Sequence, residues 1–386
     1  MKIGWRRLGL ALAVALAVLV AWEPSRVAMQ TAALLPNLFG SGPMPLTVFS
    51  EAPTRTALPY RKGNDRDLAE LWLPAWASAE KPAGAMLLIF GVNNLGRNHP
   101  VIERVADGLA RTGVAVLVPD SRTLLEGRLE VGEIDGVVQA FELLVSRPEV
   151  DPERVGIVGF SVGGSLALLA AADPRISGNV RWVNAFGAFA EAATYLTSVA
   201  AHAYIGPSGE PVDWQPTPLA REVFVNFLLS QVTNTDDSAV LRSRYAEAVL
   251  AGERPAPDVA LRESLRTDAG RAVHDLLTAE SLVRARTAIA ALPVDSRAFI
   301  DAISPARQLA GIEADVYLMH EIDDFHVPYV ESRALADALR ERGLLAAHTE
   351  FRLFDHVQPD DLDLLAAAPE LWKLLWHVHA LMVETL

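Results

Sequence analysis

The residues most suited to chemistry lie in the stretch VGIVGFSVGGSLALLAA, residues 155–171, where glycines surround a single serine. Gly159-Phe160-Ser161-Val162-Gly163 fits the pattern G-x-S-x-G, between an apolar run typical of a strand and a run typical of a helix. In such a turn the serine backbone is strained, and side chains at the two glycine positions would collide across the bend. The pattern therefore predicts that Ser161 is an exposed nucleophile.

A nucleophilic serine needs a base, and the base needs an acid that orients it. In the chain order serine, acid, histidine, both partners are expected at the carboxyl ends of later strands. The run DVYLMH is followed by EIDDFHVP, which supplies Asp324, with Asp323 as its rival. The run TEFRLF is followed by DHVQPDD, which supplies His356. We therefore expect a triad of Ser161, Asp324 and His356.

Other histidines fit these roles less well. His326 lies too near the acid to come from the next strand, His320 lies within its strand, and His348 precedes the final strand. His377 and His379 stand two apart on a predicted helix, so their side chains point to different sides. The chain contains no cysteine, which excludes disulfides and thiolate chemistry. We expect neither a metal nor a cofactor.

Strands and helices alternate around these residues. Continuous apolar runs (GAMLLIFG, VAVLVPD, RVGIVGF, VRWVNAFGAF) alternate with helical patterns such as HPVIERVADGLARTG and EIDGVVQAFELLVSRP. Strands without polar alternation are those buried on both faces of a parallel sheet, so we expect a doubly wound, mostly parallel α/β core. Two earlier segments, PLTVFSEAP and RDLAELWLPA, are expected as strands joined by YRKGNDR.

The alternation stops at residue 191 and resumes at 304, and the intervening residues are helical with loops. We divide the chain into a leader and linker (1–45), a first part of the core (46–190), a helical lid insertion (191–303) and a second part of the core (304–386). Aromatic side chains in the insertion suit either an apolar substrate group or ordinary packing: Tyr195, Tyr204, Trp214, Phe224 and Phe227.

Residues 84–190 and 304–386 resemble the α/β-hydrolase superfamily, particularly its dienelactone-hydrolase-like and prolyl-oligopeptidase-like serine hydrolases. Many members read H-G-x-D-D-x-x-V-P after the acid-bearing strand, and the segment from His320 to Pro328 follows this pattern with Glu321 in place of the glycine. The resemblance implies the α/β-hydrolase fold and selects Asp324 over Asp323 as the acid.

The resemblance also implies an oxyanion hole made by the backbone N–H groups of Val162 and Val92, with Asn93 as the alternative to Val92. The family often has His-Gly in the loop that supplies the second donor, whereas this chain has Phe-Gly. Asn93 and Asn94 are candidates to brace the loop in place of that histidine, although both also suit an ordinary turn.

Together these features predict acyl transfer from a small-molecule ester to Ser161 and then to water. Three alternatives stay open: a peptidase, an acyltransferase, and an inactive hydrolase core that serves as a membrane-tethered binding protein. The 48 acidic and 34 basic residues give a net charge of -14, which argues against a nucleic acid partner. The oligomeric state cannot be read from the sequence.

The first residues predict export. Lys2, Arg6 and Arg7 precede an apolar run at residues 8–22, as in a signal peptide or a short membrane anchor. No convincing small-x-small cleavage motif follows closely, so we favour an uncleaved anchor, with Ala21 and Ala33 as the sites to watch for cleavage. The positive end should stay in the cytoplasm, which places the catalytic part on the other side.

Overall fold

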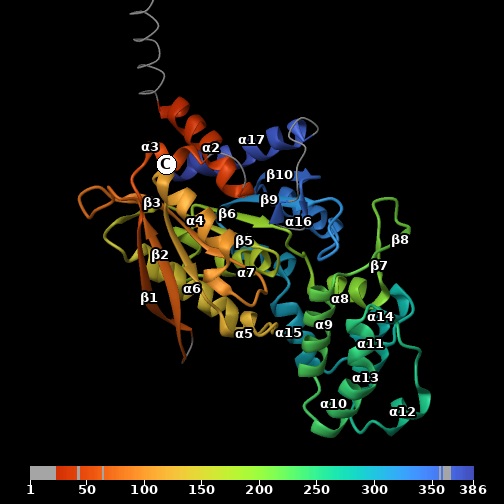
Figure 1. Cartoon of the computed structure of the whole chain (residues 1–386). Coiled ribbons are helices and arrows are strands. Elements are labelled where there is room, and N and C mark those ends of the chain that lie inside the picture. Colours follow the sequence, from red (N-terminus) through yellow and green to blue (C-terminus); the bar gives the residue numbers. More distant parts are fainter. Residues whose placement is uncertain (1–22, 41–43, 63–64, 356–357, 360–366) are drawn as a thin grey trace, which may run out of the picture.

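The molecule is built on an eight-stranded sheet (Figure 1). The computed structural model describes residues 23–40, 44–62, 65–355, 358–359 and 367–386. The strand order is β1-β2-β4-β3-β5-β6-β9-β10; β2 runs antiparallel to both neighbours and the remaining pairs are parallel. The strands are β1 (Thr54–Lys62), β2 (Asp65–Leu73), β3 (Ala83–Ile89), β4 (Ala115–Pro119), β5 (Val150–Phe160), β6 (Trp182–Phe186), β9 (Asp315–Glu321) and β10 (Leu345–Phe351).

The inner strands of this sheet are buried on both faces. Every residue of β3 and of β6 is buried, as expected for the continuous apolar runs that predicted them. The prediction of an α/β fold with a mostly parallel sheet is therefore confirmed.

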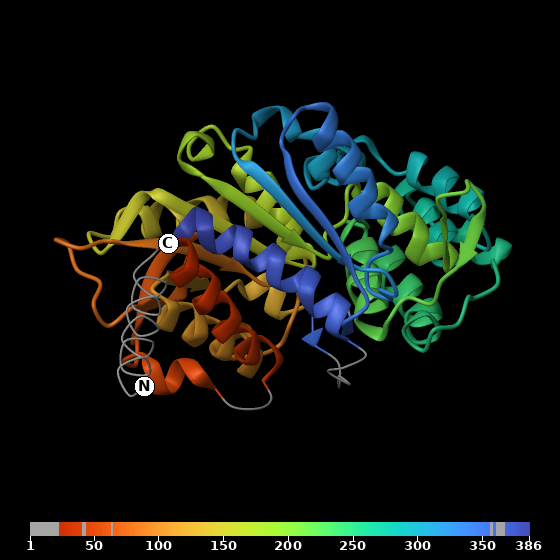
Figure 2. The same ribbon diagram turned by 90° about the horizontal axis from the view of Figure 1, so that it is seen from above.

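Helices cover each face of the sheet. On one face lie α2 (Glu23–Phe39), α4 (Pro100–Thr112) and α17 (Ala368–Thr385), which pack on the strands through a shared apolar cluster. On the other face lie α6 (Gly132–Val145), α7 (Val162–Ala171) and α16 (Val330–Glu341). Seen from above, α17 and α2 lie side by side across the sheet (Figure 2).

One predicted strand near the start of the core is wrong. The segment PLTVF forms the short helix α3 (Pro45–Phe49), and the strand begins only at Thr54. Pro45 fixes a backbone angle suited to a first helical turn. Val48 and Phe49 are 75% and 85% exposed, so their side chains are not packed against a face of the sheet. The predicted connection YRKGNDR is also largely strand, because β1 and β2 extend into it from both sides.

Between β6 and β9 the chain forms a group of helices with its own apolar core, which we call the helical insertion (residues 191–303). Figure 1 shows it in green to teal beside one end of the sheet. It also contains a short exposed hairpin, β7 (Ala203–Ile205) and β8 (Pro211–Asp213). Its helices are α8 (Ala192–Ala201), α9 (Pro218–Ser230), α10 (Thr235–Leu241), α11 (Glu247–Leu250), α12 (Val259–Ser264), α13 (Asp268–Leu277), α14 (Leu282–Ala290) and α15 (Val294–Ala302).

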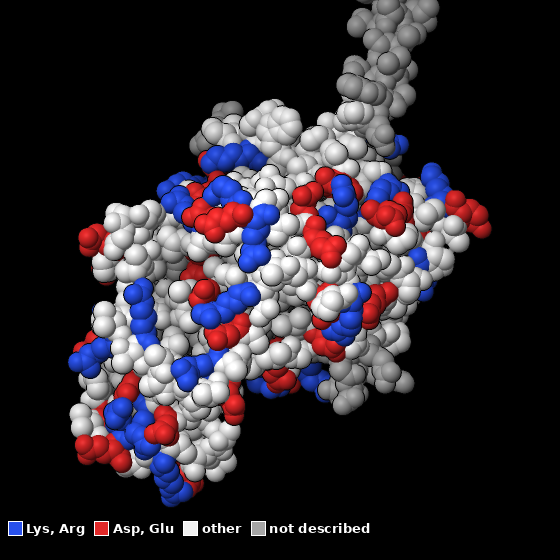
Figure 3. Space-filling view, turned by 180° about the vertical axis from the view of Figure 1, so that it is seen from behind, with Lys and Arg blue, Asp and Glu red and all other residues white. Residues whose placement is uncertain are grey.

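The surface carries acidic and basic side chains close together. Figure 3 shows Lys and Arg interleaved with Asp and Glu over the face turned away from the view of Figure 1. Among the ion pairs of the molecule, Arg128 contacts both Glu126 and Glu130. Basic charge on this face is therefore offset by neighbouring acids, which weakens its attraction for a polyanion.

Two predictions concern residues outside those described. The apolar run at residues 8–22 precedes the first described residue, and His356 falls between described residues 355 and 358. Within the part of the chain that the structure covers, no helix has both the length and the apolar character needed to span a bilayer.

Candidate active site

Ser161 lies at a sharp turn between β5 and α7. Its backbone has φ 56° and ψ -132°, a conformation that residues with a side chain rarely adopt. The Ser161 N–H donates to the carbonyl of Phe186 at 2.7 Å, and its own carbonyl accepts from Gly164 at 2.8 Å. Such a backbone costs about 1–3 kcal/mol and persists only where its surroundings enforce it. Strain at this residue is a property expected of a nucleophile elbow.

The flanking glycines are required by the closeness of the turn. A Cβ on Gly159 would lie 2.2 Å from the carbonyl oxygen of Gly163. A Cβ on Gly163 would lie 2.5 Å from the carbonyl oxygen of Ile89 on the neighbouring strand. Both clashes are with backbone atoms, which cannot rotate away. The G-x-S-x-G pattern thus reflects the packing of three backbone segments around Ser161.

The two candidate acids at the end of β9 have different environments. Asp323 is 61% exposed and pairs with Arg352 on the surface. The Asp324 side chain is fully buried, and its Oδ1 accepts from the backbone N–H groups of His326 at 2.6 Å and Val327 at 3.0 Å. A carboxylate held in this way has a fixed orientation, as an acid that positions a histidine requires.

Buried groups on β9 support this turn. Nε2 of His320 lies 3.0 Å from the carbonyl of Val327 and 3.3 Å from Oδ2 of Asp324. Because a carbonyl only accepts, this nitrogen carries the proton. His320 is therefore positioned against the carboxylate of Asp324 and the carbonyl of Val327 rather than beside Ser161.

Glu321, which replaces the family glycine, joins this turn to the segment that leads to His356. Its Oε2 accepts from the backbone N–H groups of Leu353 at 2.7 Å and Phe354 at 2.9 Å. Burial raises the pKa of the Glu321 carboxyl, although these hydrogen bonds act in the opposite direction. The backbone two residues before His356 is thus fixed, while His356 itself is not described.

The other histidines occupy distinct positions. His326 lines the same cavities as Ser161, so the structure brings to the site a residue that the sequence had set aside. His348 lies on β10 with Nε2 3.1 Å from Oγ of Ser332, and burial lowers its pKa. His377 is buried between Asn184 and Thr349, at 2.8 Å from each.

The loop after β3 lies directly against the serine. A Cβ on Gly91 would lie 2.9 Å from Cβ of Ser161, which leaves room only for glycine and brings the following N–H group, that of Val92, to the site. Val162 is the first residue of α7, so its N–H has no acceptor one turn earlier in the helix. These are the two donors expected for an oxyanion.

Asn93 braces this loop, as the sequence suggested. Its Oδ1 accepts from the N–H groups of Leu95 and Gly96, and its Nδ2 donates to the carbonyl of Gly91 at 3.2 Å. Asn94, the second candidate, is exposed. The side-chain amide of Asn93 therefore holds the loop by three hydrogen bonds to its backbone.

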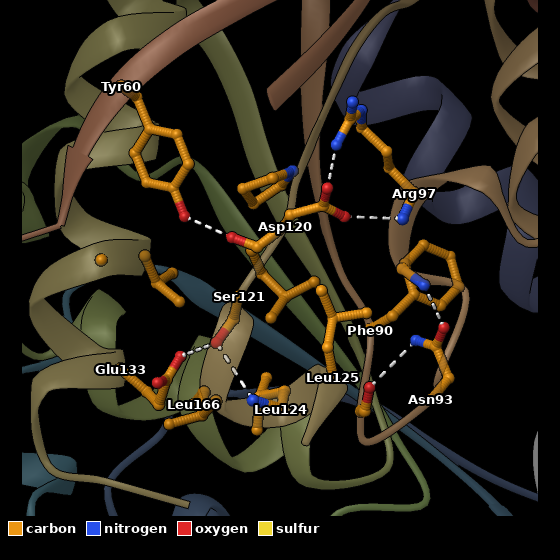
Figure 4. A pocket seen from close by; sticks show the side chains of 16 residues that line it. Tyr60, Phe90, Asn93, Arg97, Asp120, Ser121, Leu124, Leu125, Glu133 and Leu166 are labelled. Carbon is orange, nitrogen blue, oxygen red and sulfur yellow. Dashed lines mark hydrogen bonds and ion pairs between the residues drawn. The ribbon is translucent and has the colours of Figure 1, made fainter. Parts of the chain in front are cut away.

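Polar contacts around a pocket beside the loop connect the loop to the end of β4 (Figure 4). Arg97 donates its backbone N–H to Oδ1 of Asp120 at 2.8 Å, and its guanidinium pairs with Oδ2 of the same carboxylate. The Tyr60 hydroxyl donates to the carbonyl of Asp120 at 2.6 Å. The loop that carries Val92 is thus held to Asp120 through Arg97.

The helical insertion contacts the turn at residues 323–327, which holds Asp323 and Asp324 and which we call the acid turn. The indole N–H of Trp214 donates to the carbonyl of Asp324 at 2.9 Å, and the N–H of Thr217 donates to the carbonyl of Phe325 at 2.9 Å. Trp214 was expected only as an aromatic residue of the insertion, and nothing in the sequence pointed to this bond.

Comparisons with known proteins agree with this geometry. Residues 86–206 match the family model described as Dienelactone hydrolase family, and dipeptidyl peptidase 4 from Porphyromonas gingivalis superimposes with a TM-score of 0.51 at 13% identity. The chain therefore has the α/β-hydrolase fold, and about a third of it matches one family of that fold. This confirms the resemblance stated from the sequence and the fold that it implied.

Other solved structures superimpose on this chain with lower TM-scores. A puromycin-hydrolyzing peptidase from Mycobacterium tuberculosis has a TM-score of 0.49 and 16% identity, covering 87% of this chain and 39% of that one. The 2,6-dihydroxy-pseudo-oxynicotine hydrolase has a TM-score of 0.47 and 14% identity, with 86% and 68% covered. The match to dipeptidyl peptidase 4 covers 87% of this chain but 36% of that enzyme. No curated protein matches the sequence.

Two apolar cavities of the molecule meet at Ser161. The larger, of about 310 Å³, extends between the sheet and the helices α2, α4 and α17. The smaller, of about 60 Å³, lies under the helical insertion, where Tyr195, Phe224 and Phe227 contribute to its wall. Val92, Leu219 and His326 also line both cavities. Of the five aromatic residues singled out in the insertion, these three line a cavity, whereas Tyr204 packs edge-on against Tyr329.

Proposed function

We propose that this chain is a serine hydrolase that cleaves carboxylic esters with apolar substituents. The observation that carries the proposal is the position of Ser161, in a strained turn where two apolar cavities meet. A reacting carbonyl at Ser161 would have an apolar cavity on either side, so an ester could place one substituent in each.

The proposed reaction uses the residues of the expected triad. His356 accepts the proton of Ser161 while Oγ attacks the ester carbonyl carbon, and the N–H groups of Val162 and Val92 stabilise the negative oxygen. The ester C–O bond then breaks, and the alcohol leaves with the proton from His356. Water repeats the sequence in the second half and releases the acid. Asp324 holds the imidazole in the tautomer that can accept the proton.

An ester suits the site better than a peptide does. A peptide carries several N–H and C=O groups, and burying such a group without a partner costs about 1–3 kcal/mol in proteins. The cavity walls at Ser161 are mostly apolar side chains, which supply few such partners. An ester leaving group also needs less protonation than an amine.

A fluorophosphonate probe tests the proposal. We expect one covalent addition at Ser161, detected by intact mass, and hydrolysis of p-nitrophenyl butyrate. Both should disappear in Ser161→Ala and persist in the control Ser165→Ala, whose hydroxyl is buried against the backbone of Phe189 at 3.2 Å. Absence of labelling, or activity that survives Ser161→Ala, would refute the proposal. Equal rates on the matching p-nitroanilide would indicate a peptidase instead.

We also propose that residues 8–22 tether the enzyme to a membrane with its catalytic part on the non-cytoplasmic side. The support is the sequence alone, in which Lys2, Arg6 and Arg7 precede the apolar run.

A further inference from the structure

The proposed reaction does not say which part of an ester the larger cavity takes. The floor of this cavity is the sheet itself, through side chains from four strands: Met86 on β3, Val158 on β5, Phe186 on β6 and Met319 on β9. These strands are covered on this face by α2, α4 and α17 (Figures 1 and 2). The cavity therefore runs from Ser161 into the core, whereas the smaller one lies under the helical insertion.

Buried side chains from three helices line the cavity. Leu34 of α2, Leu109 of α4 and Met382 of α17 are each at most 6% exposed. A group that lies against these side chains is surrounded by the core of the molecule.

The polar side chains deeper in the cavity are already paired. Oδ1 of Asn184 lies 2.8 Å from Nε2 of His377, and its Nδ2 lies 3.6 Å from the sulfur of Met319. His99 accepts a hydrogen bond from the N–H of Val101. A polar group in this space would lose its hydration without gaining a partner, so the cavity selects an apolar one.

We propose that this cavity binds the linear acyl chain of the substrate, an inference that rests on the proposed esterase function. A cavity of about 150 Å³ can hold benzene, or about 25 Å³ for each carbon, so the 310 Å³ here corresponds to about twelve carbons. The substrate class is a medium-chain fatty acyl ester.

The position of the cavity inside the core assigns it to the acyl group rather than to the alcohol. After the first half of the reaction the acyl group stays bonded to Ser161, while the alcohol must depart and water must enter. An alcohol held between the sheet and the helices would have to leave past the acyl-enzyme. The acyl chain has no such constraint, because it is released only when its bond to Ser161 is broken.

The chain-length dependence of wild-type activity tests the proposal first. On p-nitrophenyl esters from acetate to palmitate, kcat/KM should rise by up to about fourfold per methylene, the ratio expected for burying one methylene group. The rise should end near twelve carbons, where the cavity is full. A flat profile from two to twelve carbons would overturn the assignment.

A filling substitution tests the location. Val378 on α17 lines the cavity and is half-buried. Val378→Trp adds about seven non-hydrogen atoms, or about 175 Å³ at the same packing, and should shorten the optimum by about seven carbons. Activity on the dodecanoate ester should fall more than activity on p-nitrophenyl acetate, because the longer chain needs the filled part of the cavity. Val383→Trp is the matched control, on the same helix with a side chain that is 56% exposed, and should leave the profile unchanged.

A second variant guards against loss of folding. Overpacking a core can itself destabilise a protein, so Val101→Trp fills the cavity from the opposite wall, on α4. If at least one folded variant shortens the chain-length optimum, the proposal stands. If both fold and neither alters activity on the dodecanoate ester, it is overturned.

Binding separates this inference from the proposed function. Decanoic acid should raise the melting temperature of Ser161→Ala, and the additional substitution Val378→Trp should remove that shift. If this pattern appears but wild type cleaves no ester, the cavity binds an apolar chain and the esterase function fails. If short esters are cleaved through Ser161 but decanoic acid produces no shift and the chain-length profile is flat, the esterase stands and the cavity proposal fails.

Discussion

Replacing Asp324 by asparagine should disable the enzyme, whereas the same change at Asp323 should not. Asp324 Oδ1 accepts two backbone N–H groups, and its Oδ2 lies 3.3 Å from Nε2 of His320, which carries a proton donated to the carbonyl of Val327. An asparagine that keeps its oxygen on the two N–H groups must turn its NH₂ toward His320. A donor would then face a donor, and an NH₂ group cannot accept a hydrogen bond from the imidazole of His356, the proposed base.

The expected magnitudes follow from these contacts. A buried donor left without an acceptor costs about 1–3 kcal/mol, so Asp324→Asn should lower the free energy of unfolding by that amount. Because the amide favours the wrong imidazole tautomer, kcat should fall by about 10⁴, as in serine proteases. Asp323 is largely exposed and its pair with Arg352 is worth about 0–1 kcal/mol, so Asp323→Asn should change kcat by less than about fivefold.

Both variants should be purified, melted and assayed on p-nitrophenyl butyrate at saturating substrate. The fluorophosphonate rate gives a second readout that does not depend on product release. If Asp323→Asn is the inactive variant and Asp324→Asn keeps wild-type kcat, the orientation of Asp324 has been misread and the triad must be rewritten with Asp323.

Three further outcomes are expected. Gly163→Ala should destabilise the protein by at least about 1–3 kcal/mol and abolish labelling at Ser161, because the added Cβ meets a backbone oxygen. The control Gly132→Ala places its Cβ where no atom lies within 4 Å, and it should stabilise the protein by about 0.5–1 kcal/mol. Equal melting temperatures of the two variants would contradict this prediction. Burial lowers the pKa of His377 to about 3, so below pH 6.5 the unfolded chain binds one more proton than the folded chain, and the free energy of unfolding should fall by about 1.4 kcal/mol per pH unit. His377→Gln should remove one proton from the slope of unfolding free energy against pH, measured by urea unfolding at several pH values. An unchanged slope would count against this prediction. The full chain should sediment with membranes and resist carbonate extraction; an intact mass that starts after Ala21 or Ala33 would show a cleaved signal instead.

The core and the turn at Ser161 could be predicted because their causes are local. Apolar runs without alternation indicate strands buried on both faces, and glycines at 159 and 163 are required by atoms only a few residues or one strand away. The same reasoning gave a wrong prediction for Pro45–Phe49. Its apolar and β-branched residues favour a strand, but the sequence does not show whether a neighbouring strand is available to pair with it. Which histidine is the base stays a prediction.

Other parts of the site depend on contacts between distant segments, which leave no pattern in the sequence. The cavity exists because α2, at the start of the chain, closes the space between α4 and α17. The bond from Trp214 to Asp324 joins residues 110 positions apart. Glu321 did leave a signal, as a charged residue at a family glycine, but only the structure shows that it accepts two backbone N–H groups near His356.

The bonds from Trp214 and Thr217 to the acid turn also bear on how this enzyme could change in evolution or in the laboratory. Judged by its continuous span and its own apolar core, the helical insertion looks like a detachable module. Cutting it out would leave the carbonyls of Asp324 and Phe325 without these donors, at the turn whose geometry sets the acid. The helical insertion and the acid turn must therefore be exchanged together. A chimera that takes the insertion of a relative would also need that relative's acid turn, and a variant that lacks the insertion would need a redesigned segment 323–327.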